Sequence, residues 1–205
     1  MLILGTLSFS ILLPMRIISG VRHQLAAHLP SALGRYRQRI FIQQLGWPLA
    51  SGPHQQQEQD QFDQQETVYV IALNDEGQIC GCARLLPTTQ PTLMQEVFPH
   101  LMQDHLPRSR QIWELSRFSS DGPAITRPLI DAVLACAAEL GVVRLIALSP
   151  VGVERLLSRW GILTRRAGIP VRMLGQWVCA RWIEVPARYP ATSLQCEADC
   201  GTILV

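Results

Sequence analysis

The segment 111–119 constrains the fold most, because it has the composition of a β-strand but carries two charges among its apolar residues. Trp113 and Leu115 favour a strand with an apolar backing. In a regular strand, residues three apart point to opposite faces, so Glu114 and Arg117 would be separated. A β-bulge between them would bring both side chains into one cleft. The segment alone therefore leaves two interpretations open, a charged cleft or a surface salt bridge on an edge strand.

Hydrophobic periodicity and turn residues predict alternating helices and strands along the rest of the chain. The expected helices span 31–45, 91–102, 124–140 and 150–160, and the expected strands span 67–73, 78–86, 111–119, 142–148, 171–173 and 177–185. The polar, glutamine-rich segment 50–65 is expected to be a loop. Strands and helices in this order pack in layers, so the sequence predicts an α/β domain.

The two ends differ in composition from this domain. Residues 1–14 are mostly apolar, and we interpret them as an N-terminal extension, with Met15 as an alternative start. Their apolar run is too short to span a bilayer, so no stable membrane insertion is expected. It also lacks a clear positive charge before the run and a clear small-residue cleavage site after it, which a signal peptide usually has. A buried strand and a weak membrane anchor are the alternatives. Residues 186–205 are expected to form a peripheral C-terminal segment.

Composition limits the kind of protein further. A chain of 205 residues with 48% hydrophobic residues can bury a full core in one domain. The net charge of +2 and the absence of a long basic run argue against nucleic acid as a partner. The six cysteines are scattered and lack zinc-site spacing, so we expect no metal site, and we expect reduced thiols in a cytoplasmic protein.

Common catalytic motifs are missing from the sequence. It contains no glycine-rich dinucleotide or phosphate loop, no Gly-x-Ser-x-Gly and no His-Glu-x-x-His. Nucleotide-fold, serine-hydrolase and zinc-protease functions therefore lose their usual support. The charged cleft is the candidate site that remains.

Four charged motifs with fixed spacing follow one another along the chain: Arg37-x3-Phe41-x5-Trp47, Glu58-x-Asp60-x2-Asp63, Gly81-x2-Arg84 and Trp113-Glu114-x-Ser116-Arg117-Phe118. In this order and spacing they resemble the acyl-homoserine-lactone synthases, the autoinducer synthases of bacterial quorum sensing. The resemblance covers about Met15 to Ile183, so we assign residues 15–185 to one synthase domain. It implies the N-acetyltransferase-like fold, three layers with a twisted mixed sheet flanked by helices, whose splayed central strands hold a pantetheine arm.

The resemblance also implies a reaction between S-adenosylmethionine, as a substrate and not a cofactor, and an acyl thioester. A base must take a proton from the amine, and we expect Glu114 in this role, with Glu58 as the alternative. The remaining roles implied are Arg117 as a catalytic residue and, for substrate binding, Arg37, Phe41, Trp47, Asp60, Asp63 and Arg84. Ser149 lies where relatives commonly carry a Ser or Thr that can touch a 3-oxo group of the acyl chain.

The acyl donor implied is a thioester on acyl carrier protein, with acyl-CoA as an alternative. Carrier proteins are strongly acidic, and the basic cluster Arg155, Arg159, Arg165 and Arg166 is expected to dock one. We expect a monomer or weak dimer. An acetyl-CoA-dependent N-acetyltransferase and a non-catalytic acyl-binding module stay open as other functions, as do the length and 3-substitution of the acyl chain.

Overall fold

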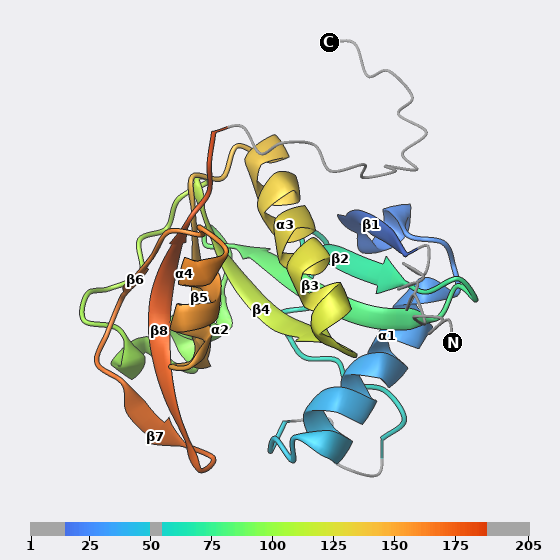
Figure 1. Cartoon of the computed structure of the whole chain (residues 1–205), viewed down its shortest axis with the longest axis horizontal. Helices are drawn as coiled ribbons and strands as arrows, with labels where there is room; N and C mark the ends of the chain where they lie inside the picture. Colours follow the sequence, from blue (N-terminus) through green and yellow to red (C-terminus); the bar gives the residue numbers. More distant parts are fainter. Residues whose placement is uncertain (1–14, 50–54, 188–205) are drawn as a thin grey trace, which may run out of the picture.

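The computed structural model describes residues 15–49 and 55–187, and these form an eight-stranded mixed sheet with helices on both faces (Figure 1). The strands run in the order β1-β2-β3-β4-β5-β8-β6, and β7 pairs with β8. All neighbouring strands are antiparallel except β4 and β5, which are parallel. The strand bounds are β1 Arg16–Val21, β2 Val68–Leu73, β3 Ile79–Pro87, β4 Ile112–Ser120, β5 Arg144–Pro150, β6 Thr164–Arg166, β7 Val171–Met173 and β8 Gln176–Glu184.

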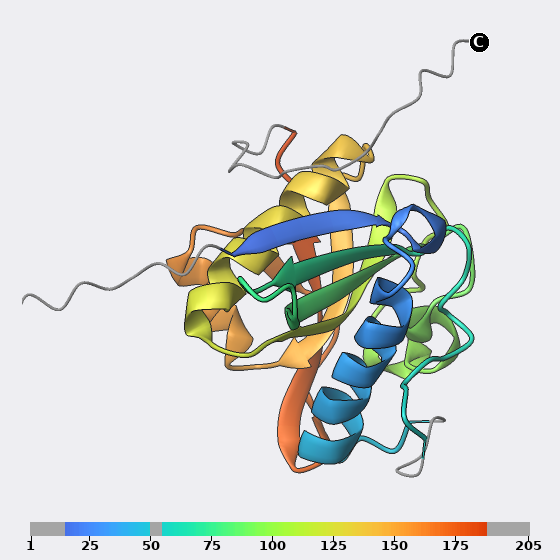
Figure 2. The same cartoon turned by 90° about the vertical axis from the view of Figure 1, so that its right-hand side faces the viewer.

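The helices cover the two faces of the sheet unequally. Helices α3 (Pro123–Glu139) and α4 (Val153–Arg159) pack on one face, over the largest core cluster. Helix α1 (Leu29–Arg37), its π-helical continuation η2 (Gln38–Gln44) and the short α2 (Leu93–Glu96) pack on the other. Figure 2 shows α1 and α3 on opposite sides of the strands. Two short 3₁₀ turns, η1 (Arg22–Gln24) and η3 (Pro99–Leu101), complete the described elements. The predicted α/β layers are therefore confirmed.

Most of the expected elements are present, with three differences. The helix predicted at 31–45 is divided, because its second half winds as a π-helix in which the N–H of Leu45 donates to the carbonyl of Ile40, five residues back. The helix predicted at 91–102 is only α2 followed by η3. Strands β1 and β6 were not predicted, because a β1 of half-buried residues and a three-residue β6 give little alternation to detect.

A β-bulge in β4 favours the charged cleft, one of the two interpretations that the sequence of this segment left open. Cys82 pairs with Ser119 and Arg84 with Ser116, so two residues of β4 lie opposite Ala83 alone. One of these two is Arg117, whose φ of 51° lies in the left-handed region that most side chains avoid. Because the bulge adds one residue, the side chains of Glu114 and Arg117 lie on the same face of the sheet, the face that α1 and α2 cover.

The two parallel strands diverge at the centre of the sheet. Their pairing ends at Leu115 and Ala147, although β4 continues to Ser120 and β5 to Pro150 (Figure 1). Beyond those residues the backbone groups that face between the strands are no longer paired with each other. This is the splayed arrangement of central strands that the fold expectation required.

The predicted extension 1–14 and most of the predicted C-terminal segment 186–205 lie outside the described residues. Strand β1 begins at Arg16, directly after Met15. Within the described ranges, no helix has the length and apolar character needed to cross a bilayer.

Candidate functional site

Six charged side chains form a closed ring between α1, the loop 55–66 and strands β3 and β4. Its members alternate in sign in the order Arg37, Glu58, Arg117, Asp60, Arg84 and Asp63, and Asp63 returns to Arg37. We call this set the ion ring. Each acid bridges two arginines, and the three ionised acids would balance the three arginines in charge.

The arginines hold the acids mainly through paired hydrogen bonds. Arg37 donates Nη1 and Nη2 to the two carboxylate oxygens of Asp63, at 2.7 and 3.1 Å, and its Nε to Glu58. Arg84 likewise donates Nη1 and Nη2 to the two carboxylate oxygens of Asp60, at 2.6 and 3.0 Å. Two parallel N–H donors match a carboxylate in distance and direction, which is why arginine and not lysine suits these positions.

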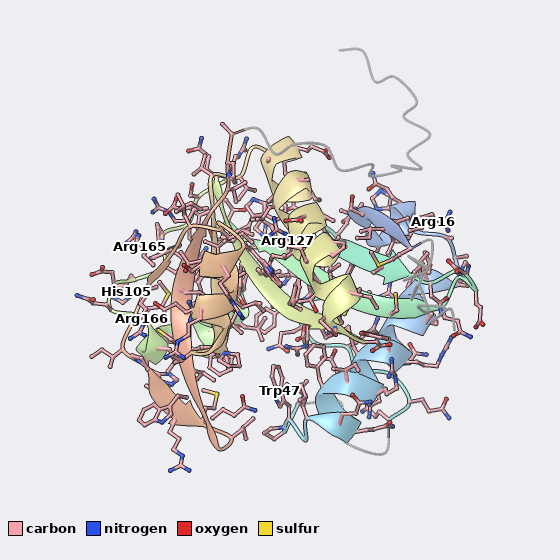
Figure 3. All side chains as sticks on the ribbon, in the orientation of Figure 1. Arg16, Trp47, His105, Arg127, Arg165 and Arg166 are labelled. Atoms are coloured by element: carbon pink, nitrogen blue, oxygen red, sulfur yellow. The ribbon has the colours of Figure 1, made fainter. Side chains whose placement is uncertain are left out.

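Arg117 links the two remaining acids. Its Nη2 donates to Glu58 at 2.9 Å and to Asp60 at 2.8 Å, and its guanidinium lies 5.5 Å from the centre of the Phe41 ring. The left-handed backbone of Arg117 aims the side chain into the ring. Phe41 in turn contacts Trp47, with ring centres 5.0 Å apart. Figure 3 shows Trp47 beside the end of the α1–η2 helix.

The ring is almost entirely removed from solvent. Glu58 is fully buried, and Arg37 and Arg84 are exposed by 2% and 1%. Burial favours the neutral form of Asp63, but the charges of Arg37 and Arg84 outweigh it and hold the pKa of Asp63 well below its usual range. Burial likewise opposes the charge of Arg37, yet Asp63 and Glu58 raise its pKa. Asp63 is therefore held ionised by the two arginines that it contacts.

Glu114 is not a member of the ring. Its side chain is buried, and Oε2 accepts a hydrogen bond from the backbone N–H of Met94 in α2 at 2.8 Å. Burial raises the pKa of Glu114, and the Met94 N–H offsets this only in part. The alternative interpretation, a surface salt bridge between Glu114 and Arg117 on an edge strand, is wrong, because β4 lies inside the sheet and the bulged backbone directs the buried Arg117 to Glu58 and Asp60.

Ser149 and the four arginines that we expected to dock a carrier protein lie on the other half of the sheet. The Oγ of Ser149 accepts from Nε of Arg181 in β8 at 2.8 Å. Arg155 and Arg159 are exposed on α4, one turn apart. Arg165 and Arg166 both lie at the β6 edge (Figure 3) but have different partners. Arg166 donates to Glu154 of α4 at 2.9 Å, whereas Arg165 lies over the Trp182 ring on the opposite face of the sheet.

Sequence reasoning missed three polar residues that belong to these surroundings. The hydroxyl of Tyr69 donates to Asp63 at 3.0 Å, and Nε of Arg84 donates to Ser116 at 3.0 Å. Arg181 is buried in β8. The available signal was strand alternation, which places Arg181 on the same inward face as Cys179 and Ile183.

Comparisons with known proteins agree with this geometry. The model of the autoinducer synthase family matches residues 23–185. The acyl-homoserine-lactone synthase of Ralstonia solanacearum is 42% identical over 174 residues, which cover 78% of this chain and 83% of that protein. The synthase of Acinetobacter baumannii is 41% identical over 185 residues, covering 83% of this chain and 100% of that protein.

Solved structures give the same result for the fold. TofI in a ternary complex with an inhibitor and MTA is 45% identical, with a TM-score of 0.77 over 85% of this chain and 94% of that one. BjaI, a CoA-dependent acyl-homoserine lactone synthase with SAM and isopentyl-CoA, is 28% identical, with a TM-score of 0.77 over 84% of each chain.

A more distant structure places the fold in a wider group. An acyl-CoA N-acyltransferase from Pseudomonas aeruginosa is 15% identical with a TM-score of 0.57, over 82% of this chain and 99% of that one, and it shares the fold alone. The expected N-acetyltransferase-like fold is thus confirmed. The matched motifs, the bulged β4 and the close relatives together show that this chain belongs to the autoinducer synthase family.

Proposed function

We propose that this protein synthesises an N-acyl-homoserine lactone from S-adenosylmethionine and an acyl thioester, releasing methylthioadenosine and a free thiol. The observation that carries the proposal is the position of Glu114. This buried carboxyl has a raised pKa and lies on the face of β4 that α1 and α2 cover. It precedes Arg117 of the ion ring by three residues along β4, and it lies next to Leu115, where the pairing of β4 with β5 ends. The relatives named as acyl-homoserine-lactone synthases support the same activity.

The first step joins the two substrates. The amine nitrogen of S-adenosylmethionine attacks the thioester carbon, the carbon–sulfur bond breaks, and the thiol leaves. The amine must first lose a proton, and a carboxylate with a raised pKa is a better acceptor near neutral pH than an ordinary one. We assign this role to Glu114, directly or through a water.

Glu58 is the weaker candidate for the same role. Both of its oxygens already accept from arginines, Oε2 from Arg37 and Oε1 from Arg117. A proton on Glu58 would break one of these interactions inside a buried site, which is unfavourable. We therefore propose that Glu58 holds Arg117 in place and that Glu114 carries the proton.

The second step closes the lactone. A carboxylate oxygen of the methionyl group attacks the carbon bonded to the sulfonium, and methylthioadenosine leaves. This step needs the carboxylate and that carbon held in contact, which is a task of positioning. The ion ring supplies both signs of charge, so we propose that Arg37, Arg84 and Arg117 with Asp60 and Asp63 bind the charged end of S-adenosylmethionine. Phe41 and Trp47 would stack on its adenosine.

We further propose that the acyl group arrives on acyl carrier protein, with Arg155, Arg159 and Arg166 as its landing site on α4. BjaI, which is described with isopentyl-CoA, keeps acyl-CoA as the alternative donor. In this account the protein works in the cytoplasm, where both substrates are made, as a monomer or weak dimer.

The test is a reaction of the purified protein with S-adenosylmethionine and matched acyl thioesters on carrier protein and on CoA, followed by mass spectrometry. We expect an N-acyl-homoserine lactone and methylthioadenosine, with the carrier thioester used at the lower concentration. An acylated amine without lactone would indicate an N-acyltransferase instead, and thioester binding without any product would indicate an acyl-binding module.

A further inference from the structure

The carboxyl of Glu114 is held by two groups at the start of α2. The backbone N–H of Met94 donates to Oε2 of Glu114 at 2.8 Å. The side chain of Thr92, the residue that caps the N-terminus of α2, hydrogen-bonds the same carboxyl. Thr92 is 0% exposed and Glu114 is 3% exposed, so the hydroxyl and the carboxyl meet away from solvent.

A second hydrogen bond fixes the direction of the Thr92 hydroxyl. Its oxygen accepts from the backbone N–H of Gln95 at 3.3 Å, which is the capping interaction of α2. A hydroxyl carries one proton and two lone pairs, whereas an ionised carboxylate can only accept. The proton of Thr92 is therefore directed at Glu114 when Glu114 is ionised, and the cap and the acid are joined through one oxygen atom.

The remaining surroundings of Glu114 are apolar side chains and two arginines. Glu114 lies opposite apolar residues on both neighbouring strands, β3 and β5. The charged groups that act on it are Arg84 of β3 and Arg117 of β4. Burial raises the pKa of Glu114, and the Met94 N–H, the Thr92 hydroxyl and then the two arginines lower it, in that order of size. The neutral hydroxyl thus opposes the effect of burial more than either guanidinium does.

A buried general base needs a donor of this kind. Glu114 can take a proton from the substrate amine only in its charged form, and burial disfavours that form. A hydrogen bond donated to the carboxylate stabilises the charged form and fixes the direction of its free lone pairs. A hydroxyl does this without adding another positive charge, which would make the carboxylate a weaker base.

We propose that Thr92 is a positioning residue for Glu114: its hydroxyl, oriented by the N–H of Gln95, keeps the carboxylate charged and fixed in direction for proton transfer from the substrate amine. This inference rests on the proposed function and adds a residue to its first step. Thr92 exchanges no proton with the substrate. If Thr92 served only as the cap of α2, its loss would lower the stability of the fold and leave the proton transfer unchanged.

The experiment is the pH dependence of kcat/KM for lactone synthesis in Thr92→Val, which keeps the shape of the side chain and removes its hydroxyl. The rate of the wild type should fall on the acid side, where Glu114 becomes protonated. In Thr92→Val this acid limb should move to higher pH by about one unit or more, because a hydrogen bond to a charged group is lost. The substrate amine titrates identically with every variant, so the difference belongs to the protein. Thr92→Ser keeps the hydroxyl and should restore the wild-type profile.

Thr88→Val is the matched control. Thr88 is as buried as Thr92, but its hydroxyl donates to the backbone carbonyls of Ser109 and Ile112, at 3.1 and 2.8 Å. Its loss should lower stability without moving the acid limb. An unmoved acid limb in folded Thr92→Val, or an equal movement in Thr88→Val, would overturn the inference. Should Thr92→Val not fold, Thr92→Gly takes its place with the same expected result, because glycine is tolerated at the N-cap of a helix.

A double variant separates positioning from capping. Adding Thr92→Val to Glu114→Gln should cause no further loss of activity, because the hydroxyl acts through a carboxylate that is no longer present. An equal loss in both backgrounds would show that Thr92 only caps α2, and it would overturn this inference alone. A fully active Glu114→Gln protein would remove Glu114 as the base and this inference with it. No lactone from the wild type would overturn the proposed function as a whole.

Discussion

At the scale of single residues, Glu114 and Glu58 show how the surroundings of a carboxyl decide its role. Glu58 is fixed between two guanidinium groups, whereas Glu114 meets a backbone N–H and an apolar environment. Burial in the second setting raises the pKa of the Glu114 carboxyl. A pair of acids whose surroundings differ in this way is a common basis for dividing structural and proton-transfer roles.

Glu114→Gln should keep the fold and lower kcat/KM by roughly 10²–10⁴-fold, because the amide has the same shape but cannot accept the proton of the amine. Initial rates of methylthioadenosine release measure the effect, with circular dichroism as the check on folding. Glu96→Gln, at an exposed glutamate of the adjacent α2, is the matched control and should be close to wild type. A fully active Glu114→Gln protein would exclude Glu114 as the base.

Arg117→Ala should destabilise the fold by about 3 kcal/mol, which is at the low end of the range expected when one partner of a buried ion pair is removed. The low value is expected because Glu58 keeps Arg37 as a partner and Asp60 keeps Arg84. Arg39→Ala is the control, since its pair with Asp121 is partly exposed and should contribute about 1 kcal/mol or less. Denaturant unfolding measures both variants. Equal losses in the two would show that the ion ring adds nothing beyond a surface pair.

The sequence could identify these residues but not their pairing. The spacing of Glu58, Asp60 and Asp63 marked the acids, and their resemblance to a family marked the arginines. Which acid meets which arginine depends on the bulge at Arg117 and on the path of a loop without periodicity. For this reason the sequence could not show that Arg117 pairs with Glu58 and Asp60 and not with Glu114.

At the scale of elements, α4 is the helix that we propose as the docking site for the acyl carrier protein. Arg155 and Arg159 share its exposed face, and Arg166 forms a partly exposed ion pair with Glu154. The edge strand β6 sends Arg165 to the other face, so a carrier protein on α4 would meet three of the four arginines that we expected. Individually such exposed charges are weak, and together they mainly set the rate of encounter.

Changing both Arg155 and Arg159 to Glu should raise the half-saturating concentration of the acyl carrier thioester strongly and leave that of S-adenosylmethionine nearly unchanged. Added salt should have a similar effect on the wild type, because screening weakens exposed charges. Arg16→Glu, on β1 at the opposite end of the sheet (Figure 3), is the control. Unchanged kinetics in the double variant, or rates with the carrier that do not depend on salt, would reject α4 as the docking site.

At the scale of the whole molecule, the buried charges make stability depend on pH. The pKa of Asp63 is lower in the folded chain than in the unfolded one, so the unfolded chain binds its proton more readily. This contribution to stability is complete above the ordinary aspartate pKa of about 3.9 and is lost as the pH falls below it. Glu114 has the opposite sign, because its raised pKa makes ionisation in the folded state unfavourable as the pH rises.

We therefore expect the free energy of unfolding to decrease between about pH 5 and pH 2, and Asp63→Asn to flatten that decrease. Above the ordinary glutamate pKa of about 4.3, ionisation of Glu114 should lower the free energy of unfolding of the wild type, and Glu114→Gln should not show this decrease. Urea unfolding at a series of pH values tests both. The same pH slope in wild type and Asp63→Asn would mean that the ion ring does not control acid stability.

The layered fold could be predicted from the sequence because it depends on periodicity, which strands such as β2 and helices such as α3 show clearly. Strand β1 could not, since it is recognisable only by its pairing with β2 at the edge of the sheet. The divergence of β4 and β5 followed only from the family resemblance, because no local pattern marks the residue at which pairing stops.

The most direct test of the central claim is the fate of the carboxylate oxygens of S-adenosylmethionine. If a carboxylate oxygen attacks the carbon bonded to sulfur, substrate labelled with oxygen-18 at both carboxylate positions gives a lactone that keeps both labels, one in the ring and one in the carbonyl. We predict this result by mass spectrometry of the product from the wild-type protein and an acyl carrier thioester. A lactone that keeps only one label, as cyclisation of a hydrolysed homoserine would give, or no lactone at all, would contradict the account.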